Sequence, residues 1–463
     1  MKKTIVVGGG ITGLSIAWKL SEKGHDVTVI ESDEMIGGLA KSVRIGNYFF
    51  DIGPHSFFSE DKEVFESVMN LFKGESGEMP YAKRSVKMLF KGKYVDYPLS
   101  AKSILQMGFW PPFLCSLSFA KSYISSFVKS LFYKKKVQDE NLTVKEWAIE
   151  NFGDYLYRNF FKPYTEQFWK IKTSELSHRV IPSNKKMDFA RTLKHLLVNK
   201  YLMISKREPG KLSLVERESL PSYYPKKGFG EIAHRIGKQI KNNGGKIYTS
   251  LEVGEILLNP DNTFSVKANG ENFSGDFLVS TIPLNKVISK IKPSLEEETT
   301  NSAKKLEYLS LVLLYLITKK KNILDCQYCY FLDKPYNRIS EMNNFSNYLS
   351  PENENILSVE ISCQNESEVW KLSNEELFSK CMRDIEKDNF LKREDVIDYK
   401  VIKVPSVYPI YKKDYEIHLQ KTEKSFNKIK NFFSVGRQGQ FYYGDIDQMI
   451  RIGIDTAAKI SKQ

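Results

Sequence analysis

The N-terminal part of the chain changes from the pattern of a buried strand to that of an amphipathic helix and back. Residues 4–7 form a short apolar run, and residues 11–21 carry apolar side chains at helical spacing. A second apolar run ends on Glu31. A strand, a helix and a strand in this order are typical of a βαβ unit. We therefore expect an α/β domain at this end of the chain.

Two later segments have patterns that complete the same domain. Residues 220–290 predict a helix, the strand KIYTSLEV, a hairpin that turns at Pro260 and Asn262, and the strand DFLVSTIP. Residues 401–463 end with a strand, a glycine turn and a closing helix. We infer one discontinuous domain assembled from residues 1–60 and these two segments.

The intervening blocks predict a second domain. Residues 61–219 have a mainly helical pattern, and residues 291–400 are mixed, with the apolar strands LSLVLLYLI and ILSVEISC. A chain of 463 residues exceeds the size of one compact core, so two or three domains are expected. A mixed α+β domain, mainly helical in its first part, is predicted here.

Glycines fill the turn between the first strand and the first helix. Gly8 lets the chain turn sharply, Gly10 lets the backbone approach a pyrophosphate, and Gly13 allows the helix to pack close to the sheet. The N-terminus of the helix then faces the phosphates. Glu31 ends the second strand, where a carboxylate accepts hydrogen bonds from ribose hydroxyls. Together these residues predict a dinucleotide site.

The composition is that of a folded, basic protein. The chain is 41% hydrophobic, and its formal charge is +13, which would suit nucleic acid, an anionic membrane surface or an anionic substrate. The acids are scattered among the bases and no nucleic-acid-binding module is recognisable. We therefore favour a lysine-rich, solvated surface and expect no nucleic-acid partner.

The chain has five cysteines, an odd number that is small for its length. We therefore expect free thiols and a reducing compartment. Cys326 and Cys329 form a CxxC pair in a strand-like aromatic run, a pattern typical of a core. Without a second pair or nearby histidines, we expect no metal site. The sequence shows neither a signal peptide nor an apolar run of about 18 residues, so we predict a cytoplasmic protein.

One stretch, residues 103–136, has two interpretations. It includes MGFWPPFLCSLSFAKSYISSFVKSLFYKKK, which combines aromatic residues and leucines with lysines. This pattern would suit a helix in a membrane interface. We favour a helix packed on its own domain, which leaves a peripheral membrane contact as the less favoured alternative.

The residues after Glu31 narrow the dinucleotide to FAD. SDEMIGGLAKS places Gly37 and Gly38 after an acidic turn, and RIGNYFFDIGPHSFF follows. This segment resembles the second glycine motif of the FAD-binding flavoenzymes related to amine oxidases, protoporphyrinogen oxidase and UDP-galactopyranose mutase. The resemblance implies a Rossmann-like FAD-binding domain of the GR2 type, with a substrate domain inserted between its segments. The FAD contacts that we predict are Gly8, Gly9, Gly10, Thr12, Gly13, Glu31, Gly38, Leu39, Val253, Gly436 and Ile446.

The C-terminal run narrows the resemblance further. GRQGQFYYGDIDQ is similar to the GR…YxYxDMDQ signature of UDP-galactopyranose mutases. The resemblance implies that Arg437 lies near the flavin, Tyr443 on a substrate diphosphate and Asp445 near the sugar. Arginine offers phosphate a planar fork of donors, and a tyrosine hydroxyl adds a donor without a mobile charge.

Four further residues are implied by similarities to the same enzymes. VYPIY contains Tyr408 as another phosphate-binding tyrosine, and KPYNRISEMNNF contains Arg338 as a second arginine for the pyrophosphate. NFFKPYTEQFWKIKTSEL places Trp169 beside the nucleotide or sugar, and GPHSFF places His55 against the flavin ring. The predicted catalytic residues are His55, Arg338, Arg437, Tyr443 and Asp445, and the predicted substrate-binding residues are Trp169, Arg338, Tyr408 and Tyr443.

The leading hypothesis is a flavin-dependent mutase, an isomerase that acts on a nucleotide sugar or glycosyl phosphate in polysaccharide biosynthesis. The resemblance implies that N5 of reduced flavin attacks the anomeric carbon and expels the diphosphate, so a reductant for the flavin is needed as a partner. The protein then has to position the substrate and stabilise charge. The mutases carry another arginine after their tryptophan, whereas SHRVIPSNKKMDF places Arg179 earlier and Lys185 and Lys186 later.

Two alternatives stay open. The first is an oxidoreductase of the amine oxidase or protoporphyrinogen oxidase type, for which the aromatic stretch 103–136 would supply an apolar pocket. The second is a non-catalytic binding protein on the same fold, as in the Rab escort and GDP-dissociation-inhibitor group. The sequence specifies neither the sugar, the nucleotide base, the reducing partner nor the oligomeric state.

Overall fold

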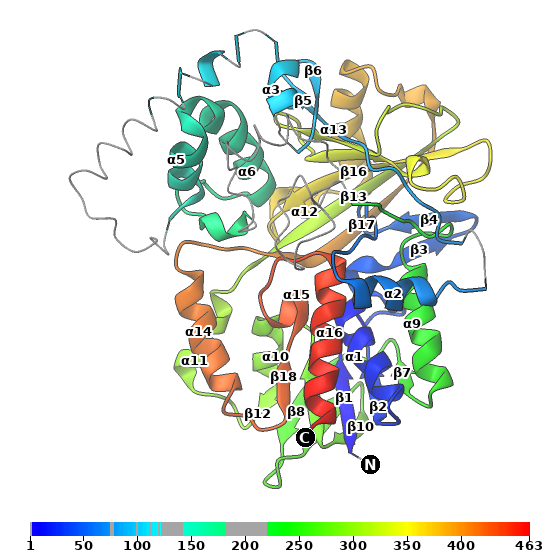
Figure 1. The fold of residues 1–463 in the computed structure, drawn as a ribbon, viewed down its shortest axis with the longest axis vertical. Helices are drawn as coiled ribbons and strands as arrows, with labels where there is room; N and C mark the ends of the chain where they lie inside the picture. The colour runs from blue at the N-terminus through cyan, green and yellow to red at the C-terminus, as the bar shows by residue number, and fades with distance from the viewer. Residues whose placement is uncertain are drawn as a thin grey trace.

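The structure is a computed structural model, and Figure 1 shows its two halves, with both termini at the end of the lower one. Each half is built around a large β-sheet. An α/β fold with a parallel sheet and a separate mixed sheet is therefore confirmed. The structure describes residues 2–74, 78–98, 101–108, 110–111, 113–115, 117–118, 121, 142–181 and 220–463.

The lower half contains a parallel five-stranded sheet in the order β18-β11-β1-β2-β7. Its strands are β1 (Lys3–Val7), β2 (Asp26–Ile30), β7 (Lys246–Tyr248), β11 (Phe277–Ser280) and β18 (Phe432–Ser434). All three segments that the sequence assigned to the FAD-binding domain contribute strands. The central strands β1 and β11 carry mostly apolar, buried residues because both faces of the sheet are covered.

One face of this sheet is covered by three helices, α1 (Ile11–Ser21), α9 (Glu231–Asn242) and α16 (Ile446–Ser461). Val6 of β1 faces these helices, whereas Ile5 and Val7 face a second core on the other side. Helices α1 and α16 lie side by side in Figure 1. Their approach requires a glycine, because a Cβ on Gly453 would lie 2.5 Å from Cβ of Ser15.

A smaller sheet and a group of helices cover the other face. The sheet is ordered β10-β9-β8-β12, and the β8–β9 hairpin turns where the sequence predicts it. The elements are β8 (Val253–Leu258), β9 (Phe264–Ala268), β10 (Glu271–Gly275), β12 (Ile291–Lys292), α10 (Leu284–Lys290), α11 (Glu297–Lys304) and α14 (Tyr415–Phe426). Their apolar residues share one core with the strand residues Ile5, Val7 and Leu278.

The upper half is built on a mixed seven-stranded sheet in the order β17-β13-β16-β15-β14-β5-β6. Its strands are β5 (Val86–Phe90), β6 (Lys93–Asp96), β13 (Tyr308–Thr318), β14 (Tyr328–Phe331), β15 (Arg338–Glu341), β16 (Asn355–Cys363) and β17 (Val396–Pro409). Strands β13 and β16 are buried along their whole length, as their apolar sequences predict. Strand β17 crosses the boundary that the sequence places between residues 400 and 401, and the division into domains stays a prediction.

The two faces of the seven-stranded sheet have different neighbours. Val312, Leu314 and Leu316 pack with helix α13 (Asn374–Lys387), near α12 (Glu368–Lys371). Leu313 and Tyr315 alternate with them and join the core of the lower half.

The remaining helices and strands of the described residues are β3 (Ser42–Ile45), β4 (Tyr48–Asp51), α2 (Lys62–Asn70), α3 (Ala101–Gln106), α5 (Val144–Leu156), α6 (Lys162–Trp169) and α15 (Gly436–Gly439).

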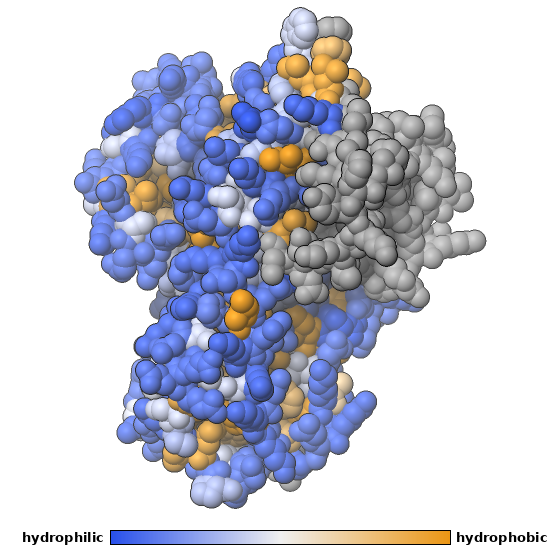
Figure 2. All heavy atoms as spheres, turned by 90° about the vertical axis from the view of Figure 1, so that its left-hand side faces the viewer, coloured by the Kyte–Doolittle hydropathy of each residue, from blue (hydrophilic) through white to orange (hydrophobic). Residues whose placement is uncertain are grey.

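The aromatic stretch 103–136 is described only in part, and its remaining residues lie outside the described ones. Trp110 is 66% exposed and Phe113 51% exposed, whereas Cys115 packs in a cluster with Trp147. Apart from the atoms drawn in grey, the face in Figure 2 is largely hydrophilic, with apolar side chains in separate small groups. No helix within the described ranges is both long and apolar enough to cross a membrane. Both interpretations of this stretch stay predictions.

Candidate active site

The turn from β1 into α1 has the geometry of a phosphate-binding site. Helix α1 has Gly10 as its N-cap, with no capping side chain and no acid in its first turn, so its N-terminal dipole is free to act on an anion. A Cβ on Gly10 would meet no atom within 4 Å, which leaves room beside the backbone. A Cβ on Gly13 would overlap the carbonyl oxygen of Gly8, so this position needs glycine for close packing.

Glu31 lies where the adenosine end of a dinucleotide would be. It follows β2 and is 9% exposed, and its Oε2 accepts a hydrogen bond of 2.6 Å from the backbone N–H of Gly9. Its Oε1 accepts one of 2.8 Å from Asp33 N–H. The Ser32 hydroxyl also donates to Oε1, at 3.2 Å, so Oε2 is the oxygen that keeps a further lone pair for a ribose hydroxyl. The N–H of Leu251 donates to the carbonyl oxygen of Glu31 at 2.9 Å, so the segment leading to Val253 runs beside this site.

The second glycine motif and the C-terminal segment close around the same turn. Gly37 donates to the carbonyl oxygen of Gly9 at 2.8 Å, and a Cβ on Gly38 would lie 3.0 Å from Cα of Gly10. Gly436 has a φ of +84°, and a Cβ there would lie 2.8 Å from Oγ1 of Thr12. Helix α16 begins shortly after, at Ile446. The residues predicted to hold FAD thus meet at one end of the parallel sheet, and their packing fits a bound dinucleotide.

A buried carboxylate fixes the turn that carries His55. Asp51 ends β4 and is fully buried, and Ser42 and Tyr224 donate hydroxyl hydrogen bonds to it. Phe229 N–H adds one of 3.1 Å, and the Tyr315 hydroxyl donates to the carbonyl oxygen of Asp51. Burial raises the pKa of Asp51 to about 6, and the bonds from Ser42 and Tyr224 oppose this effect. This network joins the turn to the upper sheet through Tyr315.

His55 is held as a neutral imidazole. Its Nε2 lies 3.1 Å from the carbonyl oxygen of Leu39 and 3.0 Å from that of Ile52. Because carbonyl oxygens only accept hydrogen bonds, Nε2 carries the hydrogen and Nδ1 is an acceptor. Burial, and then the charges of Arg437 and Arg338, lower the pKa of His55 to about 4. His55 therefore lies within electrostatic range of both arginines.

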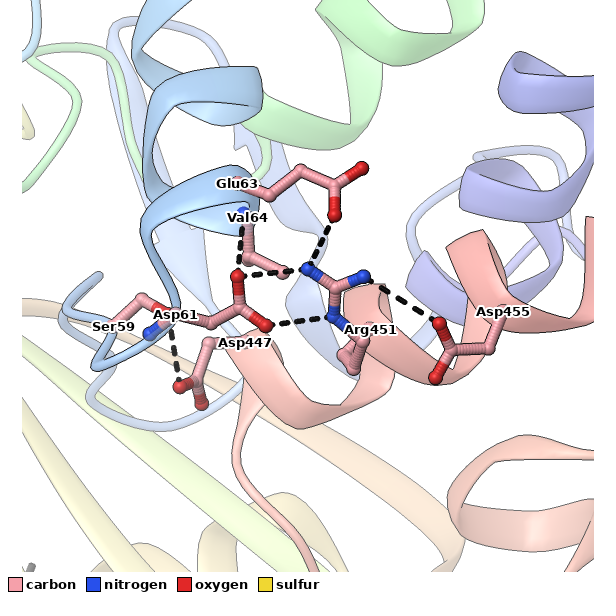
Figure 3. Close-up of polar contacts among 7 residues, drawn as sticks. All are labelled: Ser59, Asp61, Glu63, Val64, Asp447, Arg451 and Asp455. Carbon is pink, nitrogen blue, oxygen red and sulfur yellow. Dashed lines mark hydrogen bonds and ion pairs between the residues drawn. The ribbon is translucent and has the colours of Figure 1, made fainter. Parts of the chain in front are cut away.

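An ion-pair cluster fastens this segment to helix α16 (Figure 3). Arg451 donates to both carboxylate oxygens of Asp61, each at 2.7 Å, and to Glu63 at 2.9 Å. The Ser59 hydroxyl donates to Asp447 at 3.2 Å. Asp61 also accepts a bond from the N–H of Val64 and so caps helix α2. The cluster positions the turn carrying His55 relative to the start of α16.

Arg437 and aromatic residues from both halves form the centre of the candidate site. Arg437 donates to the carbonyl oxygen of Gly444 at 2.5 Å, and its guanidinium lies 5.6 Å from the ring centroid of Tyr408 and 5.8 Å from that of Tyr443. These two tyrosines pack edge to face at 5.5 Å. Trp169 contacts Tyr443 at 5.7 Å and Tyr408 at 6.2 Å. The structure thus brings together four residues that the sequence predicted.

Arg338 lies next to this group and has an acidic partner. Its Nη2 is 2.6 Å from Oε2 of Glu360, its partner in the β15–β16 register. Its guanidinium lies 5.0 Å from the ring centroid of Tyr328 and 5.5 Å from that of Tyr330. The charges of Arg338 and Arg437 both act on Tyr408, so the two arginines belong to one site.

The tyrosines of the site are not fully enclosed. Tyr164, Tyr408 and Tyr443 lie deep in the protein yet keep part of their surface accessible. Burial raises the pKa of Tyr408 to about 12, and the charge of Glu360 adds to this effect. Burial likewise raises the pKa of Tyr443. Both phenols therefore stay protonated at neutral pH and can donate hydrogen bonds to a ligand that reaches them.

Other predicted residues have different surroundings. Asp445 is exposed and is the N-cap of α16, in a capping box with Gln448. Its charge raises the pKa of Tyr443 as one of several smaller influences, so the carboxylate lies at the border of the site. Arg179 forms an ion pair of 2.7 Å with Glu416. Lys185 and Lys186 lie outside the described residues.

Sequence reasoning missed several residues of the site, namely Asp51, Tyr164, Tyr328, Tyr330 and Glu360. Glu360 had a detectable signal, because it is the charged residue in the middle of the buried strand ILSVEISC. No local signal distinguishes the tyrosines from core aromatics. The five cysteines are buried free thiols. In the described ranges, no group of His, Cys, Asp or Glu is arranged to hold a metal ion.

Comparison with known proteins identifies the family. Residues 11–458 match the model of the flavin-containing amine oxidoreductases, so the chain belongs to this family. It is therefore a FAD-dependent enzyme of the amine oxidase superfamily, and the glycine and glutamate residues described above are those that fit its cofactor.

Two of the relatives have different functions. The coproporphyrinogen III oxidase of Propionibacterium freudenreichii subsp. freudenreichii is 27% identical over 180 residues, which are 39% of this chain and 34% of that protein. A probable UDP-galactopyranose mutase of Klebsiella pneumoniae is 29% identical over 185 residues, 39% of this chain and 44% of that protein. The matched regions thus span less than half of either relative.

Two solved structures have a similar fold over the whole length of this chain. A crystal structure of reduced UDP-galactopyranose mutase has a TM-score of 0.81 at 20% identity, covering 100% of this chain and 96% of that one. A putative protoporphyrinogen oxidase from Exiguobacterium sp. 255-15 has a TM-score of 0.73 at 14% identity, covering 100% and 99%. At these identities the likeness shows the fold.

Proposed function

We propose that this enzyme is a mutase of nucleotide sugars or related glycosyl diphosphates that works with reduced FAD. The observation that carries the proposal is the cluster of Arg437, Tyr408, Tyr443 and Trp169, whose arginine lies within electrostatic range of His55. Its donors suit a diphosphate, and its aromatic walls exclude water from the bound group.

The charge of Arg437 supports binding of an anion. Within the described part of the chain, no carboxylate forms an ion pair with Arg437, and its carbonyl partner on Gly444 carries no charge. A guanidinium held between two phenol rings is oriented before a ligand arrives. A hydrogen bond to a charged group contributes about 1.5–3 kcal/mol, so this side chain alone would change diphosphate affinity by roughly 10- to 100-fold.

The remaining residues would orient the reacting group. Bound reduced FAD supplies the nucleophile for the anomeric carbon, which agrees with a site built from donors and aromatic rings. Tyr408 and Tyr443 would donate to the diphosphate as it leaves, because both stay protonated at neutral pH. Neutral His55 would add no positive charge beside the two arginines.

An oxidoreductase is the second candidate, and the matched coproporphyrinogen III oxidase supports it. Aromatic walls from Tyr164, Phe168 and Tyr330 would suit an apolar substrate. The charge of Arg437 argues against an amine substrate, because its carbonyl partner on Gly444 does not neutralise it and it would repel an ammonium group.

The test compares oxidised and reduced enzyme. FAD-loaded protein is incubated with UDP-galactose, GDP-mannose or dTDP-glucose, aerobically and after reduction with dithionite under anaerobic conditions, and the products are separated by anion-exchange chromatography. The proposal predicts an isomer of unchanged mass only with reduced enzyme, with no further consumption of reductant.

The same preparations are tested with coproporphyrinogen and putrescine while oxygen uptake is recorded. Oxygen consumption with either compound, together with unchanged nucleotide sugars, would contradict the mutase proposal and favour the oxidoreductase.

A further inference from the structure

A buried ion pair in the wall of the site has unused hydrogen-bonding capacity. Glu360 is 1% exposed, and its Oε2 receives the bond from Arg338. Among the described residues, no partner meets Oε1 of Glu360 or Nε of Arg338, although both atoms are buried. Buried polar atoms without partners are rare in proteins, and here an acceptor and a donor of the same ion pair are left free together.

The pair faces the site. Glu360 is the register partner of Leu313, which belongs to the core shared with the lower half. Gly53 adopts a φ of +82° beneath the pair, and a Cβ there would lie 3.2 Å from Oε2 of Glu360 and 3.9 Å from Nη2 of Arg338. The pair therefore lies against the turn that carries His55, on the side where FAD fits.

The chemistry of the pair selects its ligand. A phosphate offers only acceptors and would be repelled by the carboxylate, which also compensates the charge of Arg338. An ammonium group has no acceptor for the guanidinium N–H, and the nearby Arg437 would repel it. A neutral hydroxyl both donates and accepts, so it matches a free carboxylate oxygen next to a free guanidinium N–H.

We propose that Glu360 and Arg338 form a hydroxyl-binding subsite, in which one substrate hydroxyl donates to Oε1 of Glu360 and accepts from Nε of Arg338. In this arrangement Arg437, Tyr408 and Tyr443 bind the diphosphate, and the ion pair binds a hydroxyl of the sugar. This assignment rests on the proposed function, because that function supplies a sugar as the group beside the diphosphate.

The experiment measures how much the sugar contributes to binding. FAD-loaded wild-type protein is titrated by calorimetry with UDP, GDP and dTDP, and then with UDP-galactose, GDP-mannose and dTDP-glucose. The titrations are repeated with Glu360→Gln, whose amide nitrogen cannot accept a hydrogen bond. We expect affinity for the sugar derivative to fall about fivefold or more, because a polar group built to bind a hydroxyl discriminates strongly when changed.

The affinity for the nucleoside diphosphate alone should not fall. Glu360→Gln removes the charge that compensates Arg338, so the affinity for the free nucleoside diphosphate should stay unchanged or rise. Glu360→Asp keeps the charge but shortens the side chain, and it should weaken only the sugar derivative. This second variant serves if the first fails to fold.

Glu341→Gln is the matched control. Glu341 is a buried carboxylate of the same sheet, and both of its oxygens have partners, Leu324 N–H at 2.6 Å and the Asn355 amide at 2.7 Å. This variant should bind both ligands like the wild type. An equal loss, or no loss, for both ligands in the Glu360 variants would overturn the hydroxyl subsite while leaving the proposed function intact. Failure of wild-type protein to bind any of the nucleotides would instead overturn the proposed function, and the subsite with it.

Discussion

Trp169 and Tyr443 meet edge to face, with ring centroids 5.7 Å apart and ring planes at 87°. Trp169 ends helix α6 of the upper half, and Tyr443 lies just before helix α16 of the lower half. Trp169 also contacts Tyr408, which ends strand β17. The indole therefore joins the two halves at the candidate site and fixes both phenols.

Replacing this indole should loosen the phenols. An aromatic pair contributes about 0.5–1.5 kcal/mol beyond its buried area, and Trp169 forms pairs with both tyrosines. Trp169→Ala should therefore weaken nucleoside diphosphate binding by roughly 5- to 100-fold, and Trp169→Phe by less. Calorimetric titration of FAD-loaded protein measures this, with flavin content as a control for folding. Unchanged affinity in the alanine variant would show that the indole does not position the phenols.

The glycine turn gives a prediction for the cofactor. A Cβ on Gly13 would overlap the carbonyl oxygen of Gly8, so Gly13→Ala should displace α1 from the phosphate position. The purified variant should contain little FAD and unfold at a lower temperature. Gly254→Ala is the matched control, because its Cβ would meet only the carbonyl oxygen of Lys267 at 3.9 Å. Normal FAD content in Gly13→Ala would contradict the assignment of this turn.

The ion-pair cluster of Figure 3 should stabilise the protein in a pH-dependent way. Burial opposes ionisation of Asp61, but its bonds from Arg451 outweigh this and lower the pKa of Asp61. An acid with a lowered pKa stabilises the folded state above its unfolded value, about 4, and this contribution is lost as the pH falls through the folded value.

Arg451→Gln should therefore reduce the free energy of unfolding at pH 7 by about 1 kcal/mol, since the pair is partly exposed. The difference from the wild type should shrink as the pH falls below about 4. Urea unfolding at several pH values measures it. An equal difference at pH 7 and at pH 3 would mean that the ion pairs are not the cause.

His55 should stay neutral over the range in which free histidine titrates. Burial, then Arg437 and Arg338, lower the pKa of His55 to about 4. The unfolded chain takes up this proton near pH 6.5, so His55 makes stability fall as the pH drops from about 6.5 to 4. Nitrogen-15 NMR of labelled histidine should show a neutral ring at pH 5.5, with His55→Gln used for assignment. A midpoint near 6.5 would contradict the buried position.

Much of the fold could be predicted from the sequence because its signals are local. The glycines at Gly8, Gly10 and Gly13, the apolar strands and Glu31 each carry their meaning within a few residues. Asp445 carried a second local signal, since an acid three residues before Gln448 is a capping box. From the sequence, Asp445 is expected to be a carboxylate near the sugar, and the structure adds its role as the cap of α16.

The rest of the site depends on pairings between distant segments. The role of Glu360 can be recognised only once the pairing of β15 with β16 places it opposite Arg338. The register of two strands cannot be read from either strand alone. Asp51 likewise gains its role from Tyr224 and Phe229, which approach from another part of the chain. Tyr164 and Tyr330 cannot be distinguished from core aromatics in the sequence. Their place in the candidate site is seen only when the structure brings their rings together, 5.5 Å apart.

A diphosphate that binds beside the flavin under Arg437 should change the flavin absorbance. FAD-loaded protein is titrated with UDP, GDP and dTDP and with the corresponding nucleosides, while the flavin absorbance is recorded for the wild type and for Arg437→Ala. We predict that at least one diphosphate shifts the spectrum, that the nucleosides do not, and that affinity falls roughly 10- to 100-fold in the variant. A flavin spectrum that no diphosphate changes, or equal affinities of the wild type and the variant, would contradict this mode of binding.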